Sequence, residues 1–362
     1  MSIVRVANLA GVSKSTVSRV INHSDEVTPA VGRAVREAMR SIGYQPSARR
    51  RGPKPLSRRG IRTGNIAMLV MGRRPANLYR APVLPALLDG VERALAEHGL
   101  NLVLASLAAD EDLPPILRSR QADGLLLLGK WDGMPENVRA ALRAFPAVWI
   151  LREHSDVEGE FDHVFYRNAA VGRIAARYLR GRGHRRMGFL NLEAHHAAFA
   201  QRQEDFVEAI RAAEGERAEV VAIGAESTDA ASVDGASTID RLLERLPAPF
   251  GLFVAADAQV PGVYHALESR GLRPGKDVDV ICCDNEEQFL SKLSPRPATI
   301  DIAPQLVGRR GVQQLLWRMR NPGERNRISV LVEPRLVLPE ESKASASRRS
   351  VQGSAEDTRV RS

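Results

Sequence analysis

The sequence predicts a small all-α helix-turn-helix headpiece followed by an α/β core of two similar doubly wound parallel-sheet lobes. Apolar residues at helical spacing, interrupted by a glycine turn, predict the headpiece over residues 1–48. From residue 65, short apolar runs of strand length alternate with amphipathic helices, which is typical of parallel sheets covered on both faces. This alternation is too long for one sheet and restarts near residue 165, so two lobes are expected.

The first two helices are expected within residues 5–22. An apolar stripe at positions i, i+3 and i+4 indicates the first helix: Val6, Leu9 and Ala10. Gly11 supplies the turn, and the Ser13 hydroxyl can cap the second helix by accepting a backbone N–H. Three residues of the second helix are expected to face inward: Val17, Val20 and Ile21.

The outward face of the second helix carries short hydroxyls, one amide and two cations: Lys14, Ser15, Thr16, Ser18, Arg19 and Asn22. Such a face can hydrogen-bond phosphates and base edges in a groove of DNA. With Ser13 at the helix start, these residues form the predicted DNA contact. We expect Lys14, Ser15 and Arg19 to read bases. We expect Thr16, Ser18 and Asn22 mostly to position the helix on phosphates.

A third helix is expected after Thr28, because Pro29 suits the first helical position and Thr28 suits the cap. It runs to about Ser41, and Gly43 ends it. Its apolar face consists of Val31, Val35, Ala38 and Ile42. An ordinary three-helix subdomain is the alternative to a DNA-binding module, but motif, charge and linker together favour DNA binding.

Charge divides the chain into two parts. Residues 1–62 hold 13 Lys and Arg against 3 Asp and Glu, whereas the remaining residues hold 39 against 40. A basic end is therefore attached to a nearly neutral body. Such an end attracts phosphate, with strong dependence on salt.

Residues 49–64, RRRGPKPLSRRGIRTG, combine cations with proline and glycine and cannot build a packed core, so they are expected to be a linker. The order R-R-G-P-K-P resembles AT-hook arms, in which an extended Arg-Gly-Pro segment lies in a narrow A·T-rich minor groove. On this interpretation Arg50, Arg51 and Lys54 lie in that groove. A solvated tether that touches phosphates non-specifically is an equally good interpretation.

The core is expected over residues 65–340. Eight runs have strand character: 66–71, 100–106, 123–129, 147–152, 186–191, 218–224, 251–257 and 277–283. Amphipathic helices are expected at 87–99, 169–184 and 260–271. Residues 341–362 lack apolar periodicity and are expected to be a disordered tail.

Motifs along nearly the whole chain resemble the LacI/GalR family of bacterial transcription regulators. They are AGVSKSTVSRVIN, VTP and IGYQP in the headpiece, and GNIAMLV, QADGLLLLG, GRIAARYLRGRGHRRMGFLN and LFVAADAQVPGVYHALESRGLRPGKDVDVICCDN in the core. SPRPATIDIAPQLVGRRGVQQLL matches the family's return crossover. The resemblance covers about residues 2–340 and implies a core like periplasmic sugar-binding proteins. It implies lobes of about 65–165 plus 299–325 and 166–298 plus 326–340, with a ligand cleft between them.

The linker departs from this family, which usually has a short hinge helix that pushes a leucine into the minor groove. Pro53 and Pro55 would break such a helix here.

Ligands of open α/β sheets bind beyond the carboxyl ends of the strands. Arg202, in QRQEDF, matches the arginine of the family's R-x-x-G-F motif, which holds effector oxygens. Asp284 matches the family's acid that pairs with sugar hydroxyls, and Asp257 falls where an Asn-Asp pair usually lies. A surface arginine and helix-capping aspartates are the alternatives, and for Asp257 capping is equally favoured.

The aromatic N-P-F-F of the family is replaced by APVL at 81–84, so a surface that stacks on a sugar must come from elsewhere. Tyr79 and Trp131 are the candidates. Cations near the expected cleft could recognise an acidic or phosphorylated sugar, although solvated loop charges are slightly favoured: Arg73, Arg74, Arg152 and Arg167. Two further departures are Ala256 in place of the usual Asn and Asp205 in place of the Gly of R-x-x-G-F.

No phosphate-loop, dinucleotide, nucleophile-elbow or zinc-protease motif occurs in the sequence, so no enzyme, cofactor or metal is expected. His195 and His196 are adjacent but lack companion ligands at metal-binding spacing. Cys282 and Cys283 are adjacent too and are expected to be buried in a strand, in a reducing compartment. No signal pattern or apolar run of membrane-spanning length is present.

The sequence therefore predicts a cytoplasmic transcription regulator, expected to be a repressor and nucleoid-associated when bound to DNA. It is expected to bind a pseudo-palindromic double-stranded operator as a homodimer, because one short recognition helix reads few base pairs. Its expected effector is a small carbohydrate. The alternatives are an architectural A·T-rich minor-groove protein with a ligandless core, and a sugar-processing enzyme that acquired a headpiece.

Overall fold

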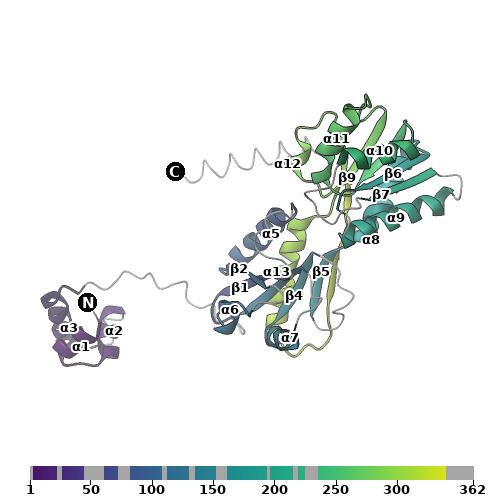
Figure 1. Cartoon of the computed structure of the whole chain (residues 1–362). Helices are drawn as coiled ribbons and strands as arrows, with labels where there is room; N and C mark the ends of the chain where they lie inside the picture. Colours follow the sequence, from purple (N-terminus) through teal and green to yellow (C-terminus); the bar gives the residue numbers. More distant parts are fainter. Residues whose placement is uncertain are drawn as a thin grey trace. The chain divides into compact units, whose positions relative to one another are not determined.

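The computed structural model describes residues 3–22, 27–44, 61–71, 82–107, 112–129, 135–151, 161–193, 196–214, 219–224 and 235–339. The chain forms two compact units, residues 1–56 and 57–362 (Figure 1). The first unit is the headpiece, and the second contains both sheets of the core.

The described residues of the headpiece form three helices: α1 (Ile3–Ala10), α2 (Lys14–Asn22) and α3 (Pro29–Ser41). Gly11 adopts a positive φ of 64° at the turn between α1 and α2, as expected. The buried residues of this small core are Val6, Ala7, Val17, Val20, Val35 and Ala38. The stripe predicted for the first helix is wrong at Leu9, which is 57% exposed, because the inward face turns through Val6 and Ala7 instead.

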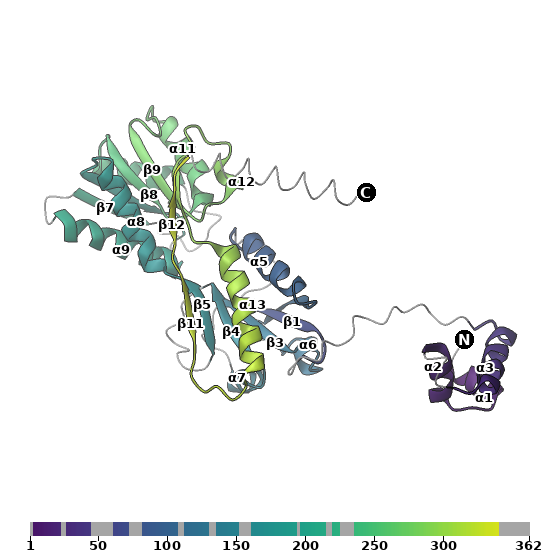
Figure 2. The same cartoon turned by 180° about the vertical axis from the view of Figure 1, so that it is seen from behind.

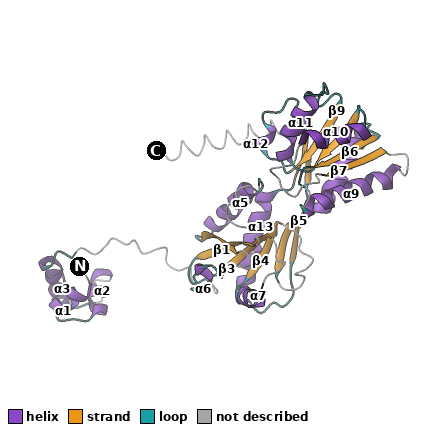
Figure 3. Ribbon diagram, in the orientation of Figure 1, coloured by secondary structure: helices purple, strands orange, loops and turns teal. Residues whose placement is uncertain are grey.

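The first sheet of the core has the strand order β11-β5-β4-β3-β1-β2, and each pairing in it is parallel. Its strands are β1 (Asn65–Met71), β2 (Asn101–Leu107), β3 (Gly124–Gly129), β4 (Ala147–Leu151), β5 (Asp162–Tyr166) and β11 (Ser329–Val332). The helices of this lobe are α5 (Leu84–Ala96), α6 (Pro115–Arg118), α7 (Glu136–Arg143) and α13 (Pro304–Arg320). Figure 3 shows helices flanking the sheet.

The second sheet has the order β12-β10-β9-β8-β6-β7, in which only β12 is antiparallel to its neighbour. Its strands are β6 (Arg186–Asn191), β7 (Glu219–Gly224), β8 (Phe250–Val254), β9 (Val278–Cys283), β10 (Ala298–Asp301) and β12 (Arg335–Val337). Its helices are α8 (Asn168–Gly181), α9 (Ala197–Glu214), α10 (Gly235–Arg245), α11 (Val260–Glu268) and α12 (Glu287–Leu290), with a 3₁₀ turn, η3, at Asp257–Gln259.

The chain passes between the two sheets three times: after β5, between β10 and α13, and between β11 and β12. Figure 2 shows β11 and β12 following one another from the first sheet to the second. The lobe boundaries expected from the sequence differ here: β10 lies in the second sheet and β11 in the first. These strands are short and change sheets within a few residues, so apolar periodicity did not mark the crossings.

Candidate functional site

The predicted recognition helix α2 begins as the sequence indicates. The backbone N–H of Thr16 donates to the Ser13 hydroxyl at 3.1 Å, which caps the helix. Lys14, Ser15 and Arg19 are exposed, whereas Thr16 and Ser18 are half-buried. Asn22 ends the helix, but its side chain is outside the described residues, as are the linker residues Arg50, Arg51 and Lys54.

The last residues of the predicted linker are bonded to the core. The carboxylate of Asp123, which precedes β3 and is 6% exposed, accepts the backbone N–H groups of three successive residues, Arg62, Thr63 and Gly64, at 2.7 to 3.0 Å. Successive backbone N–H groups make a concave site for an anion, and here a side chain of the same chain fills it. The point at which the chain enters β1 is therefore fixed.

Arg202 on α9 lies at the centre of a buried polar cluster, although it is a charged residue with only 1% exposure. Its helix approaches α8 closely, because a Cβ on Gly172 would lie 2.5 Å from the backbone oxygen of Arg202. Its guanidinium lies 5.2 Å from the ring centre of Phe199. This close packing of α8 and α9 places the guanidinium at the carboxyl ends of the second sheet's strands.

The Arg202 guanidinium donates four hydrogen bonds. Nε donates to Asn168 Oδ1 at 3.1 Å, and Nη1 donates to the Ala255 carbonyl at 2.6 Å. Nη2 donates to Asp284 Oδ1 at 3.0 Å and to the Tyr166 hydroxyl at 3.2 Å. Tyr166 is the last residue of β5 in the first sheet, so Arg202 connects the two lobes.

Asp284 follows β9 in an unusual backbone conformation. Its φ is 115° and that of Asn285 is 57°, a region that residues with side chains rarely adopt. The Asp284 N–H donates to the Ile300 carbonyl at 2.8 Å, and the side chain is buried. Burial raises the pKa of the Asp284 carboxyl, and the charge of Arg202 opposes that rise. Backbone strain of this kind gathers at ligand sites, where the surrounding structure holds it in place.

Asp257, at the start of η3, is fully buried and does not cap its own helix. Its carboxylate accepts the Thr299 hydroxyl at 2.9 Å and the Glu286 backbone N–H at 2.7 Å. Burial raises its pKa to about 7, and the charge of Asp284 adds to the rise. Burial likewise raises the pKa of Glu286 to about 8, with contributions from Asp284 and Asp257. Three carboxyl groups thus lie close to one another at this edge, and one of them, Asp284, is bonded to Arg202.

The structure brings Arg202, Asp284 and Asp257 into one cluster at the carboxyl ends of the second sheet. Tyr79 and Trp131 lie outside the described residues, as do Arg73, Arg74 and Arg152. Arg167 is described, and its Nε donates to Glu333 Oε1 at 2.9 Å.

The sequence reasoning missed Tyr166, Asn168 and Glu286. Tyr166 ends a five-residue strand that was not predicted, so its approach to Arg202 had no local signal. Glu286 lies two residues after Asp284, and that proximity was its only indication in the sequence. Asn168 begins α8, 34 residues before Arg202, and had no such indication.

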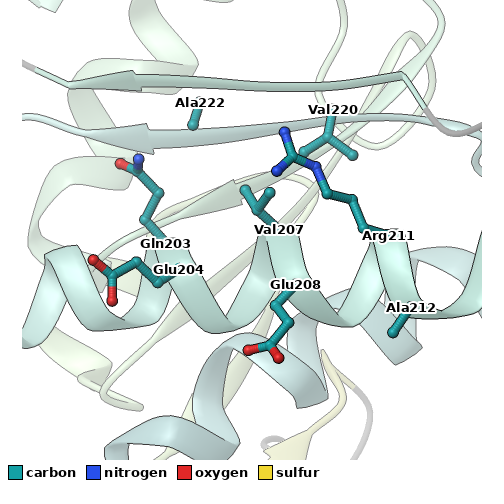
Figure 4. Close-up of a pocket in the computed structure, with 8 residues that line it drawn as sticks. All are labelled: Gln203, Glu204, Val207, Glu208, Arg211, Ala212, Val220 and Ala222. Atoms are coloured by element: carbon teal, nitrogen blue, oxygen red, sulfur yellow. The ribbon is translucent and has the colours of Figure 1, made fainter. Parts of the chain in front are cut away.

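Cys282 and Cys283 are fully buried in β9, as predicted, and burial raises both thiol pKa values. Among the described residues, no group of three or more His, Cys, Asp or Glu could hold a metal ion. A groove of about 720 Å³ lies between α9 and β7, but Arg202 is not among its lining residues (Figure 4). None of the described helices is long and apolar enough to cross a membrane.

Residues 2–47 match a family model described as bacterial regulatory proteins, lacI family, and residues 176–339 match a periplasmic binding protein-like domain. The transcriptional regulator CelR of Thermobifida fusca is 31% identical over 92% of this chain and 96% of its own length. The ribose operon repressor of Escherichia coli strain K12 is 30% identical over 88% of this chain and 92% of its own length.

The solved complex of CelR with cellobiose has a TM-score of 0.61 and 28% identity, and the match covers 93% of this chain and 98% of that one. The lac repressor dimer bound to operator and an anti-inducer has a TM-score of 0.64 at 19% identity, covering 94% of this chain and 99% of that one, which shows a shared fold. These relatives are transcription regulators rather than enzymes. The chain belongs to the LacI family of bacterial DNA-binding regulatory proteins.

Proposed function

We propose that this regulator represses transcription as a cytoplasmic homodimer on a pseudo-palindromic operator, and that a sugar or sugar derivative controls it. The effector binds at the carboxyl ends of the second sheet, where Arg202, Asp284 and Asp257 converge. The observation that carries the proposal is this buried, strained polar cluster in a chain with a lacI-type headpiece. Polar groups gathered at the strand ends of an apolar lobe suit a ligand site.

The charge of the cluster favours an effector rich in hydroxyl groups. Asp257, Asp284 and Glu286 supply carboxyl groups, and Arg202, the one arginine in the described part of this cluster, is already bonded to Asp284. A neutral sugar supplies hydroxyls that can donate to or accept from carboxyl groups, whereas an acidic or phosphorylated sugar would find no unpaired cation among the described residues of the cluster. CelR in complex with cellobiose and the ribose operon repressor agree with a neutral sugar as the class of effector.

Control of DNA binding follows from linkage between two sites. An effector that binds one arrangement of the lobes more tightly shifts the population toward it. The linker enters the core at Asp123, so a change in the first sheet moves the attachment point of the headpiece. Two headpieces are proposed because one short recognition helix reads few base pairs.

The test is a thermal-shift screen followed by a DNA-binding titration. Cellobiose, ribose, other neutral sugars, sugar acids and sugar phosphates are added separately, because a bound ligand raises the unfolding temperature in proportion to occupancy. The sugar that shifts the transition is then titrated against Asp284→Asn in a gel-shift assay. Loss of the response with retained DNA binding supports the proposal, and a response at the parent's sugar concentration removes Asp284 from the site.

The matched control is Asp277→Asn, since Asp277 flanks the opposite end of the same strand and is paired with Arg273. It should keep the parent's response. A screen in which only anionic sugars stabilise the protein contradicts the neutral-sugar proposal. Footprinting tests the alternative: broad protection of A·T-rich DNA would favour an architectural protein with a ligandless core.

A further inference from the structure

The amino-terminal edge of the first sheet is rich in arginine. Strands β1, β3, β4 and β11 begin at this edge, and α13 ends there. The arginines at these strand starts and helix ends include Arg62, Arg118, Arg120, Arg143, Arg318, Arg320, Arg325 and Arg327. A pocket of about 340 Å³ at the start of β4 and β5 is lined by three of them: Arg143, Arg318 and Arg327. We call this surface the basic edge.

Five described carboxylates lie at the basic edge, and each is already engaged. Asp112 lies 4.0 Å from Arg118 Nη1, and Glu324 accepts the Asn326 backbone N–H at 2.8 Å. Asp123 holds backbone N–H groups, Asp162 accepts Arg318 Nε at 2.9 Å, and Glu136 accepts Arg143 Nη1 at 2.7 Å. By contrast, four exposed arginine side chains have no hydrogen bond or ion pair with any other described residue: Arg62, Arg120, Arg320 and Arg325. Within the part of the chain that the structure describes, no carboxylate is paired with any of these four arginines.

The basic edge is also where the headpiece is tethered. Asp123 accepts the backbone N–H groups of the three residues that precede β1. The linker therefore joins the core where β1 and β3 begin side by side, next to Arg62 and Arg120. Neighbouring strands lie about 4.8 Å apart, so the edge from β11 to β1 spans roughly 20 Å. That length corresponds to about six base pairs of duplex at 3.4 Å each.

We propose that the basic edge binds the phosphate backbone of DNA beside the sequence read by the headpiece. The contact is expected to be sequence-independent, because it is carried by charge, and charge contacts to phosphates do not read bases. It rests on the DNA binding of the headpiece, and it adds a second DNA contact that the lacI-type headpiece does not itself supply. Any movement of the first sheet then changes this contact as well as the headpiece position.

The experiment compares two triple variants of the full chain. Arg120→Ala/Arg320→Ala/Arg325→Ala neutralises the basic edge, and Arg177→Ala/Arg211→Ala/Arg245→Ala removes the same charge from exposed helix positions of the second lobe. The probe is a duplex selected by the full chain from random DNA. It is used at about 50 base pairs and again trimmed to about 20, the span of two half-sites. Affinity is measured from about 50 to 200 mM salt.

The basic-edge variant should reduce the slope of log affinity against log salt by roughly 2–3 on the long duplex, since each lost phosphate contact removes about 0.9. Between about 50 and 200 mM salt, the parent should therefore lose about 40-fold more affinity than the basic-edge variant loses. On the trimmed duplex it should match the parent more closely. Equal slopes for both triple variants on the long duplex would overturn the proposal. If the parent selects no duplex at all, the proposed DNA binding of the headpiece is contradicted, and the basic-edge proposal falls with it.

Discussion

Arg202 Nη2 lies 3.0 Å from Asp284 Oδ1, in an ion pair whose members are 82 residues apart in sequence and almost fully buried. The same arginine is bonded to Asn168, Tyr166 and the Ala255 carbonyl. The two residues that most resemble the family's effector contacts are thus also a structural pair. Their substitution acts on stability as well as on ligand binding.

Removing Arg202 alone should destabilise the core. Arg202→Ala leaves a buried carboxylate without its partner, which typically costs about 3–5 kcal/mol. Adding Asp284→Asn should recover part of that loss, because the amide carries no charge, so the double variant should lose less than the sum of the single variants. Urea unfolding of all four proteins measures this. Arg273→Ala, which breaks an exposed pair, should change the free energy of unfolding far less, because solvent screens that pair. Additive losses at Arg202 and Asp284 would contradict the coupling.

Arg19 is predicted to read a base from the exposed face of α2. Arg19→Ala should weaken binding to the selected duplex by about 1–3 kcal/mol and relax the preference at one base pair. Competition between the selected duplex and random DNA measures this. An equal loss on both would assign Arg19 to phosphate contact, and Arg33→Ala, on an exposed position of α3, serves as the control.

The linker cations Arg50, Arg51 and Lys54 are predicted to lie in the minor groove. Their joint replacement by alanine should weaken binding most on duplexes with an A·T centre, where the groove is narrow and its negative potential strongest. Duplexes that differ only in their central base pairs provide the comparison. If affinity falls equally on A·T and G·C centres, the linker is an electrostatic tether.

Glu286 should make stability depend on pH. Its pKa is raised from about 4.5 to about 8 in the folded protein. Between these two pH values the folded state therefore binds more protons than the unfolded state. The free energy of unfolding should therefore fall as pH rises from about 4.5 to about 8. Glu286→Gln stays neutral and should flatten that fall, whereas Glu244→Gln, at an exposed position, should not. Urea unfolding at several pH values checks this; parallel curves for parent and Glu286→Gln would contradict it.

Much of the fold was readable from the sequence because its elements follow local periodicity. The eight predicted strands all occur within a few residues of their expected bounds, as do the three headpiece helices. The short strands β10, β11 and β12 were not predicted, since three or four residues carry too little pattern and their sheet is set by distant partners. The prediction that Leu9 is buried was wrong for a related reason. In a helix this short, a rotation of about one residue about the helix axis decides which side chains face inward.

The candidate site was only partly readable. Arg202, Asp284 and Asp257 could be named one by one, because each stands near a strand end or matches a family motif. Their convergence with Tyr166 and Glu286 depends on how α9 packs against α8 and how the chain crosses between sheets, which no local pattern encodes. The reach of Arg202 into the first lobe is visible only in three dimensions.

The bonds between Asp123 and the backbone of residues 62–64 mark a position at which a different headpiece could be fused to the core. Asp123 bonds to backbone N–H groups, so this contact does not depend on the side chains of Arg62 and Thr63, while Gly64 adopts a positive φ of 76° that suits glycine. The contact likewise does not involve the residues that precede Ile61. Headpieces and linkers from other regulators could be grafted there while the sensor remains intact. The sequence of the headpiece can therefore change without changing the contact between Asp123 and the backbone at the start of the core.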